Sequence, residues 1–146
     1  MKDTVQMTDD DREGRVVTFY SYKGGTGRTM TLANAAWILA ANGKRVLTVD
    51  WDLEAPGLSR FFHPFLDADA LGSTGGVLNM INNYVERAFA RTSAEAATES
   101  GRAAVMGYSM GLNWDFPGGG AIDFISAGTL NDDYSDILSG LNWDQF

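Results

Sequence analysis

The chain has 146 residues, 45% of them hydrophobic, which is enough to bury the core of one globular domain or of a large piece of one. Its formal net charge of -8 disfavours nonspecific binding to nucleic acid or anionic lipid, because those partners attract clustered lysines and arginines. The absence of cysteine excludes disulfides, thiol catalysis and thiolate metal ligands.

The first residues, 1–14, are polar and acidic (MKDTVQMTDDDREG), and we expect them to form a flexible N-terminus ahead of a domain over residues 15–146. They lack the apolar core of a signal peptide. No later stretch approaches the roughly 20 apolar residues of a membrane span. These features predict a cytoplasmic protein without a membrane span.

The first elements alternate between strand and helix. Residues 15–21 (RVVTFYS) are β-branched and aromatic and run directly into glycines, which is typical of a buried strand that ends in a functional turn. Residues 29–42 place Met30, Ala33, Trp37 and Ala40 on one helical face, and a glycine follows at the expected C-terminal cap. Residues 45–50 (RVLTVD) predict a second strand. These elements fill about 35 residues, the size of a βαβ unit, so we predict an α/β fold with a parallel sheet flanked by helices.

Further elements are predicted downstream. Apolar residues at helical spacing predict a helix over residues 77–91, and AIDFIS predicts a strand over residues 121–126. Tyr134, Ile137, Leu138 and Leu141 form one face of a short helix after the turn-like NDD. Residues 94–120 mix an alanine-rich start with glycines, which favours a weak helix followed by a mobile loop.

The stretch KGGTGRTM, residues 23–30, has the composition of a phosphate-binding loop. Glycines allow backbone N–H groups to converge on phosphate oxygens, and the start of a helix adds favourable partial charge. The general pattern G-x-x-x-x-G-K-[ST] is missed twice, because Tyr22 stands at its first glycine and Arg28 at its lysine.

A lysine directly before the paired glycines makes KGGTGRT closely resemble the deviant loop KGGxGK[ST] of the MinD and ParA group of P-loop ATPases. The resemblance continues through TLANAAWILAANGKRVLTVDWDLEAPGL and covers about residues 16–62. It is closest to bacterial regulatory ATPases that combine similar FYSYKGGTGRTM and VDWDLEAPGL stretches and usually have arginine in the loop. The resemblance therefore implies a P-loop NTPase fold and a working ATP site.

Loop chemistry and the resemblance together predict which residues bind the nucleotide. Thr29 has a hydroxyl suited to ligate Mg²⁺ between the β- and γ-phosphates, and Arg28 can neutralise phosphate charge. The planar fork of an arginine is bulkier and more directional than an ammonium, so binding can survive while the geometry for hydrolysis worsens. The predicted cofactor-binding residues are Lys23, Gly24, Gly25, Thr26, Gly27, Arg28, Thr29 and Met30.

The resemblance also implies catalytic and metal roles. Lys23 would reach the phosphates of a facing subunit, which implies a nucleotide-dependent homodimer. Asp50 would support the Mg²⁺ shell through water, and Asp52 would orient the attacking water. The predicted catalytic residues are thus Asp52 and Lys23, the predicted metal-site residues are Thr29 and Asp50, and Pro56 with Gly57 would begin a switch segment.

The leading functional hypothesis is an ATP-binding, slowly hydrolysing switch domain that passes its nucleotide state to a protein partner the sequence does not identify. One alternative is a noncatalytic nucleotide-binding fragment. Another is the ATP-binding part of a bacterial tyrosine-kinase-like protein, although a tyrosine-rich tail is absent from this chain. A dinucleotide-binding Rossmann domain is disfavoured because G-x-G-x-x-G does not occur.

The family's second Mg²⁺ motif is an apolar run that ends in aspartate, and none follows the D-x-D stretch here. We therefore expect the chain to be the N-terminal portion of a longer ATPase domain. Its sheet would lack a strand beside the loop strand, which would leave apolar surface and unpaired backbone groups exposed.

Overall fold

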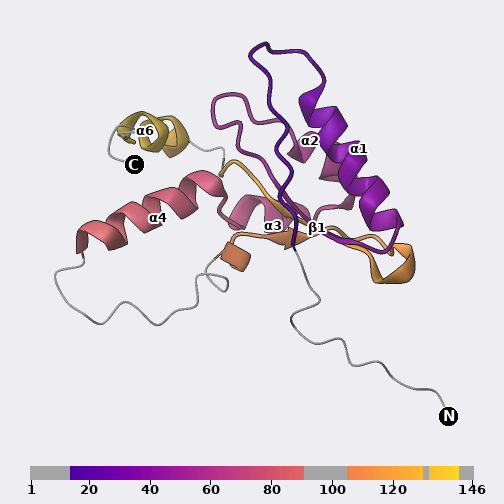
Figure 1. Ribbon diagram of the computed structural model, residues 1–146. Coiled ribbons are helices and arrows are strands. Elements are labelled where there is room, and N and C mark those ends of the chain that lie inside the picture. Colours follow the sequence, from indigo (N-terminus) through magenta and orange to yellow (C-terminus); the bar gives the residue numbers. More distant parts are fainter. Residues whose placement is uncertain (1–13, 91–104, 130–131, 142–146) are drawn as a thin grey trace.

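The computed structural model describes residues 14–90, 105–129 and 132–141 (Figure 1). Two sequence predictions fall largely outside these residues: the flexible N-terminus over residues 1–14 and the weak helix that begins at residue 94. None of the helices in the described part of the chain is long and apolar enough to cross a membrane.

A three-stranded sheet has the order β1-β3-β2. Strand β1 (Arg45–Val49) runs parallel to β3 (Ala121–Ile125), which confirms the strands predicted at these places. Strand β2 (Met110–Gly111) pairs antiparallel with β3 and lies in a region predicted as a loop. The expectation of a parallel sheet is therefore correct for one of the two strand pairs only.

Helices cover both faces of the sheet, as predicted. Ile122 and Phe124 of β3 pack against α1 (Arg28–Ala41) and α2 (Ser59–Phe62). Ile125, on the alternate face, packs against α4 (Val77–Ala90) and α6 (Asp132–Gly140). Figure 1 shows α4 and α6 beside each other on the opposite side of the picture from α1. The helices predicted at 29–42, at 77–91 and after NDD are confirmed within one or two residues.

Short elements connect these layers. The chain after α2 continues through the 3₁₀ helix η2 (His63–Phe65) and helix α3 (Ala68–Ser73). Asp67 caps α3, because its Oδ1 accepts hydrogen bonds from the N–H groups of Asp69 and Ala70, each at 2.9 Å. A second 3₁₀ helix, η3 (Pro117–Gly119), precedes β3.

Helix α1 packs through small side chains. Its buried residues are all alanines, whereas Met30 is 53% exposed although the sequence analysis placed it on the packed face. The alanine face allows a close backbone approach, since a Cβ on Gly120 would collide with the carbonyl oxygen of Ala40. The helix ends at Ala41, and Gly43, directly after the C-cap residue Asn42, has a φ of 77° and donates its N–H to the Ala40 oxygen at 2.9 Å. The predicted glycine cap is thus confirmed.

The strand predicted over residues 15–21 is wrong. This segment leads to α1 as an extended chain outside the sheet (Figure 1), and Val16 and Val17 are 96% and 69% exposed. β-branched composition indicates only that a segment suits a pleated, half-buried surface, and a strand also needs a neighbour that supplies backbone partners. In the described residues β1 pairs with β3 alone, so the first strand of the predicted βαβ unit does not form.

Candidate functional site

The predicted phosphate loop leads into the first turn of α1. Gly25 and Gly27 have φ values of 72° and 80°, in the left-handed region that favours glycine. The loop is braced by hydroxyl groups: the Ser21 Oγ donates to the Lys23 carbonyl oxygen at 2.9 Å and lies 2.9 Å from the Thr26 Oγ1. Gly25 and Gly27 therefore adopt backbone conformations that other residues rarely reach, just before the start of the helix, and their role in binding phosphate stays a prediction.

The backbone N–H groups of the loop glycines are available to bind a ligand. Gly27 stands at the N-cap of α1 and provides no side-chain cap. Among the described residues, no hydrogen bond engages the N–H groups of Gly24, Gly25 or Gly27. A Cβ on Gly24 or Gly25 would meet no atom within 4 Å, so the space in front of these residues is open. Amides without a hydrogen-bond partner among the described residues, beside open space ahead of a helix, fit the phosphates of a nucleotide.

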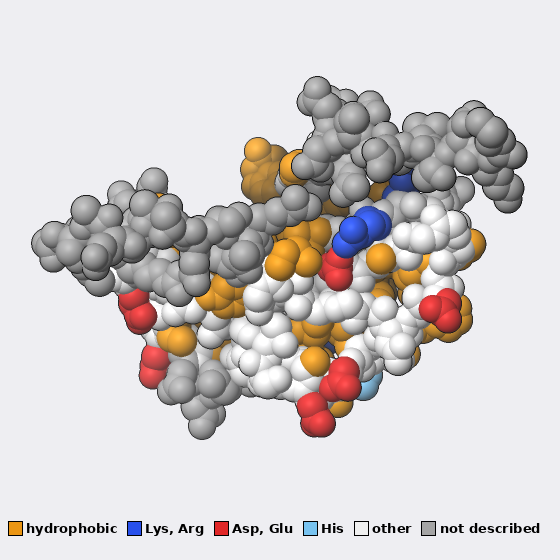
Figure 2. Space-filling view, turned by 90° about the horizontal axis from the view of Figure 1, so that it is seen from below, with side chains coloured by type: hydrophobic (Ala, Val, Ile, Leu, Met, Phe, Trp, Pro, Cys, Tyr) orange, Lys and Arg blue, Asp and Glu red, His pale blue; other side chains and the backbone are white. Residues whose placement is uncertain are grey.

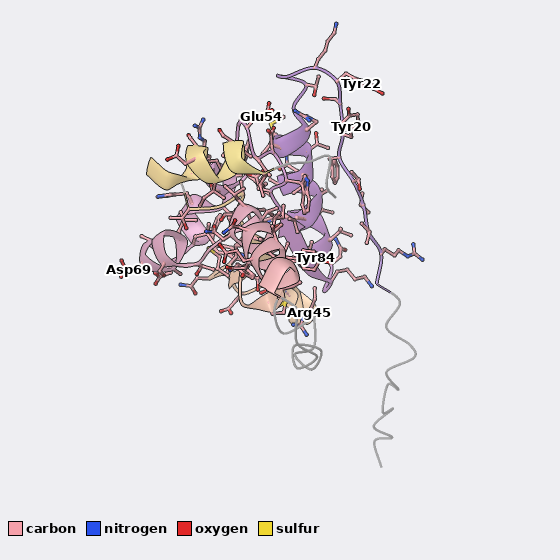
Figure 3. All side chains as sticks on the ribbon, turned by 90° about the vertical axis from the view of Figure 1, so that its left-hand side faces the viewer. Tyr20, Tyr22, Arg45, Glu54, Asp69 and Tyr84 are labelled. Carbon is pink, nitrogen blue, oxygen red and sulfur yellow. The ribbon has the colours of Figure 1, made fainter. Side chains whose placement is uncertain are left out.

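Two tyrosine side chains before the loop are exposed at the surface. Tyr20 and Tyr22 are 69% and 94% exposed, and their ring centroids are 5.3 Å apart in an edge-on arrangement. Figure 3 shows both side chains at the projecting end of the molecule that carries the loop.

Arg28 and Asp52 lie together, although 24 positions separate them in the sequence. The Nη2 of Arg28 is 3.7 Å from the Oδ2 of Asp52, and its Nη1 donates to the Ser21 carbonyl oxygen at 3.4 Å. The side chains are 33% and 42% exposed, so water screens the ion pair and it contributes at most about 1 kcal/mol. The pair joins the phosphate loop to the D-x-D segment, and it is weak enough for an anionic ligand to replace.

Asp50 has a different setting. It is 7% exposed, its Oδ2 accepts the N–H groups of Gly57 and Leu58 at 3.0 Å each, and its Oδ1 accepts the N–H of Asp52 at 3.3 Å. The segment after β1 therefore folds around this carboxylate. Sequence reasoning missed this anchoring role, and the water-mediated Mg²⁺ role of Asp50 stays a prediction.

A pocket of about 290 Å³ is lined by Thr29, Gly57, Arg60 and Phe61. It lies between the start of α1 and the segment that follows the D-x-D stretch. No group of three or more histidines or carboxylates that would hold a metal ion occurs in the described parts of the chain. Mg²⁺ commonly takes few protein ligands and completes its shell with water and substrate phosphates, so a single threonine hydroxyl in this pocket fits that ion.

Two residues in and beside the site were not predicted as functional. Arg60 lines the pocket, but nothing in its sequence spacing distinguishes it from a solvated arginine. Tyr134 of α6 donates from its hydroxyl to the Leu53 carbonyl oxygen at 2.8 Å. Burial raises the pKa of Tyr134, and the negative charges of Asp50 and Asp52 raise it further. The helical pattern predicted that Tyr134 packs inward, but not which group its hydroxyl binds.

Lys23 and Met30, the other predicted residues with long side chains, both lie at the surface. Lys23 is exposed within the loop, and Met30 lies in the first turn of α1 with an exposed side chain. The structure thus brings Thr29, Arg28 and Asp52 to one region, with Asp50 behind them as an anchor. Facing-subunit contacts of Lys23 stay a prediction.

Comparisons with known proteins agree with the motif. Residues 14–59 match a family model described as "AAA domain". The "Uncharacterized ATP-binding protein MJ0924" of Methanocaldococcus jannaschii is 45% identical over 49 residues, which are 34% of this chain and 19% of that protein. The "Succinoglycan biosynthesis transport protein ExoP" of Rhizobium meliloti is 40% identical over 52 residues, which are 36% of this chain and 7% of that protein. No solved structure matches the chain.

The family-model match covers the glycine loop, helix α1, strand β1 and the D-x-D stretch, and it includes Arg28, Thr29, Asp50 and Asp52. The matches to the two relatives span less than a fifth of the length of either relative. The resemblance predicted from the loop is therefore confirmed over residues 14–59, and this segment is similar to the MinD/ParA-type P-loop ATPases.

Proposed function

We propose that residues 14–62 bind ATP with Mg²⁺ and act as a nucleotide switch of the MinD/ParA type. The observation that carries this proposal is the Arg28–Asp52 pair, because it links the phosphate loop to the D-x-D segment through a contact that phosphate can replace. The open loop amides and the similarity to an ATP-binding protein support the same reading.

Each part of the site has a separate task in this proposal. The loop amides and Arg28 bind phosphate oxygens, and Lys23 adds a further positive charge. Thr29 holds Mg²⁺, which neutralises phosphate charge when it is bound. Asp52 orients water once Arg28 has turned to the phosphates, and hydrolysis is slow because arginine replaces the usual lysine.

The switch signal has a physical route. Asp52 begins a segment whose backbone is tied to Asp50 at Gly57 and Leu58 and to Tyr134 at Leu53. A nucleotide that binds Arg28 breaks the ion pair between Arg28 and Asp52 and so removes one contact that holds this segment. The hydrogen bond of Tyr134 connects the segment to α6. Helix α6 is therefore the element through which the nucleotide state reaches a partner.

One observation favours a second candidate function, the binding of nucleotide without turnover. The segment before the loop is not held in the sheet, so the described residues fix the loop mainly through α1. Phosphoryl transfer depends on accurate positioning, and a loop held on one side can bind phosphate while orienting water poorly. Measured phosphate release separates the two candidates.

Calorimetric titration with ATP, with and without Mg²⁺, tests the proposal. Thr29→Ala should weaken binding at least about tenfold in Mg²⁺, because a contact with a charged group is lost, and change it little without the metal. The matched control is Thr31→Ala in the same helix, since the Thr31 hydroxyl already donates to the Gly27 oxygen at 2.9 Å and is not a pocket residue. Absence of ATP binding by the folded wild-type chain would overturn the proposal.

A further inference from the structure

The pocket beside Thr29 has a basic side chain that the proposed mechanism does not use. Arg60 lines this pocket of about 290 Å³ together with Gly57 and Phe61. The pocket lies next to the residue proposed to hold Mg²⁺, and therefore next to the place of a nucleotide's terminal phosphates. The question is whether Arg60 is a solvated surface residue or part of the binding site.

The backbone around Arg60 is fixed. The N–H of Arg60 donates to the Gly57 carbonyl oxygen at 3.2 Å, and the N–H of Gly57 is bound to the Asp50 carboxylate at 3.0 Å. Leu58 and Phe62, on either side, are each only 1% exposed and anchor this turn in the core that α1 also contacts. Arg60 is exposed between them, so its buried neighbours set the position of its backbone, and the residue lines both this pocket and a neighbouring one with Ser59, His63 and Pro64.

The charges at the site favour an anion in the pocket. Arg28 is engaged by Asp52, and no carboxylate lines the pocket. Within the described residues, Arg60 makes no ion pair. The chain as a whole has a net charge of -8, so a basic side chain without a carboxylate partner beside a phosphate loop is notable. A guanidinium in that position matches the paired oxygens of a phosphate group.

We propose that Arg60 binds the terminal phosphate of the nucleotide and makes the site prefer ATP to ADP. This inference rests on the proposed function, since it needs a nucleotide in the loop. Arg60 belongs to the segment that follows the D-x-D stretch, so its contact with the terminal phosphate adds a second attachment between that segment and the triphosphate. Loss of that phosphate on hydrolysis removes the attachment, which gives the switch segment a direct means of distinguishing ATP from ADP.

The test compares Arg60→Ala with Arg45→Ala. Both remove one positive charge from an exposed arginine, but Arg45 begins β1 at the end of the strand away from Asp50, and Figure 3 shows it far from the loop tyrosines. The dissociation constants of ATP and ADP, both with Mg²⁺, are measured by calorimetry on the 146-residue chain and its variants. Circular dichroism establishes that each variant is folded.

Arg60→Ala should weaken ATP binding at least about tenfold and ADP binding by less than about twofold, because only ATP has the phosphate that Arg60 contacts. Arg60→Lys should retain part of the preference for ATP. An ATP affinity equal to that of Arg45→Ala, or equal losses for ATP and ADP, would overturn the role of Arg60. Either result would leave the proposed function standing, whereas a wild-type chain that binds neither nucleotide contradicts the proposed function itself.

Discussion

At the scale of single residues, two aspartates of one short motif have opposite surroundings. Asp50 is buried and accepts three backbone N–H groups, whereas Asp52 is 42% exposed and faces Arg28. Residues two positions apart in a regular strand would share a face, so the different surroundings arise because the chain turns after β1, where the N–H of Asp52 donates to the Asp50 Oδ1. The first carboxylate therefore maintains the shape of the segment, and the second is available for chemistry.

Asp52→Asn should separate binding from turnover. The substitution removes the carboxylate that competes with phosphate for Arg28, so ATP affinity should stay the same or rise by up to about fivefold, a gain that corresponds to at most about 1 kcal/mol. Phosphate release should fall strongly, because orienting water matters in the transition state more than in the bound ground state. Affinity is measured by calorimetry and turnover by phosphate release.

Glu54→Gln is the matched control for Asp52→Asn. Glu54 is an exposed acid in the same segment and makes no ion pair with Arg28. Its substitution should leave both affinity and turnover unchanged. An Asp52→Asn variant with normal phosphate release would remove Asp52 from the mechanism.

Residue chemistry allowed part of the site to be predicted from the sequence. Glycines before a helix, a threonine after them and a D-x-D stretch at the end of the next strand together are typical of a phosphate-binding loop. The loop could therefore be predicted from the sequence. The approach of Arg28 to Asp52 was not predicted, because it depends on how the chain turns after β1. Arg60 was missed for the same reason: its place at the pocket follows from the buried contacts of Leu58, the N-cap residue of α2, and of Phe62 in that four-residue helix, which is too short to show a helical period in the sequence.

At the scale of elements, α6 is attached to the site segment by one buried hydrogen bond. Tyr134 is 8% exposed, and its hydroxyl donates to the carbonyl oxygen of Leu53, a residue that lies after the end of β1. Ile137 and Leu138 pack on the same core as α4. The helix thus combines an apolar face with one polar contact that fixes where it meets the D-x-D segment.

Tyr134→Phe should destabilise the chain by about 1–3 kcal/mol at pH 7, because the Leu53 oxygen would remain buried without its donor. The raised pKa of Tyr134 makes this difference depend on pH. Above about pH 10, tyrosine ionises in the unfolded chain while the folded chain still retains its proton, so the wild type loses stability as pH rises towards the folded pKa. The stability difference between wild type and variant should therefore shrink from pH 10 upwards.

Urea unfolding at pH 7 and at pH 11 measures this change. Tyr84→Phe is the control, because Tyr84 lies on α4 with 66% of its surface exposed. A difference near zero at pH 7 would show that the buried hydroxyl does not stabilise the chain, whereas an equal, non-zero difference at both pH values would contradict the raised pKa of Tyr134.

The longer elements were predictable because burial leaves a regular pattern in them. Helices α1, α4 and α6 show the helical period, and β1 and β3 are short apolar runs bounded by turns. Strand β2, at Met110–Gly111, is too short to show any period. The strand prediction for residues 15–21 was wrong for a different reason: their composition suits a strand, but strand pairing depends on a neighbour elsewhere in the chain.

At the scale of the whole molecule, one edge of the sheet is open within the described residues. β1 lies at the end of the order β1-β3-β2, and Leu47 in its middle is 45% exposed. Figure 2 shows further hydrophobic patches between scattered acidic side chains on one face. This one-sided pairing supports the proposal that residues 15–146 form part of a larger ATPase domain, in which another strand would cover the edge.

The open edge predicts that the 146-residue chain associates with itself through β1. Unpaired N–H and C=O groups beside an exposed apolar side chain form a template for another strand, and a charge placed on such an edge opposes pairing. Leu47→Lys should therefore raise the monomer fraction in light scattering at a fixed protein concentration, while ATP affinity stays within about twofold because Leu47 is not a residue of the proposed nucleotide site. Ile38→Lys provides the comparison, since Ile38 is 61% exposed but lies on α1. Equal gains from the two lysines would mean that general surface hydrophobicity drives association and that the β1 edge has no special part in it.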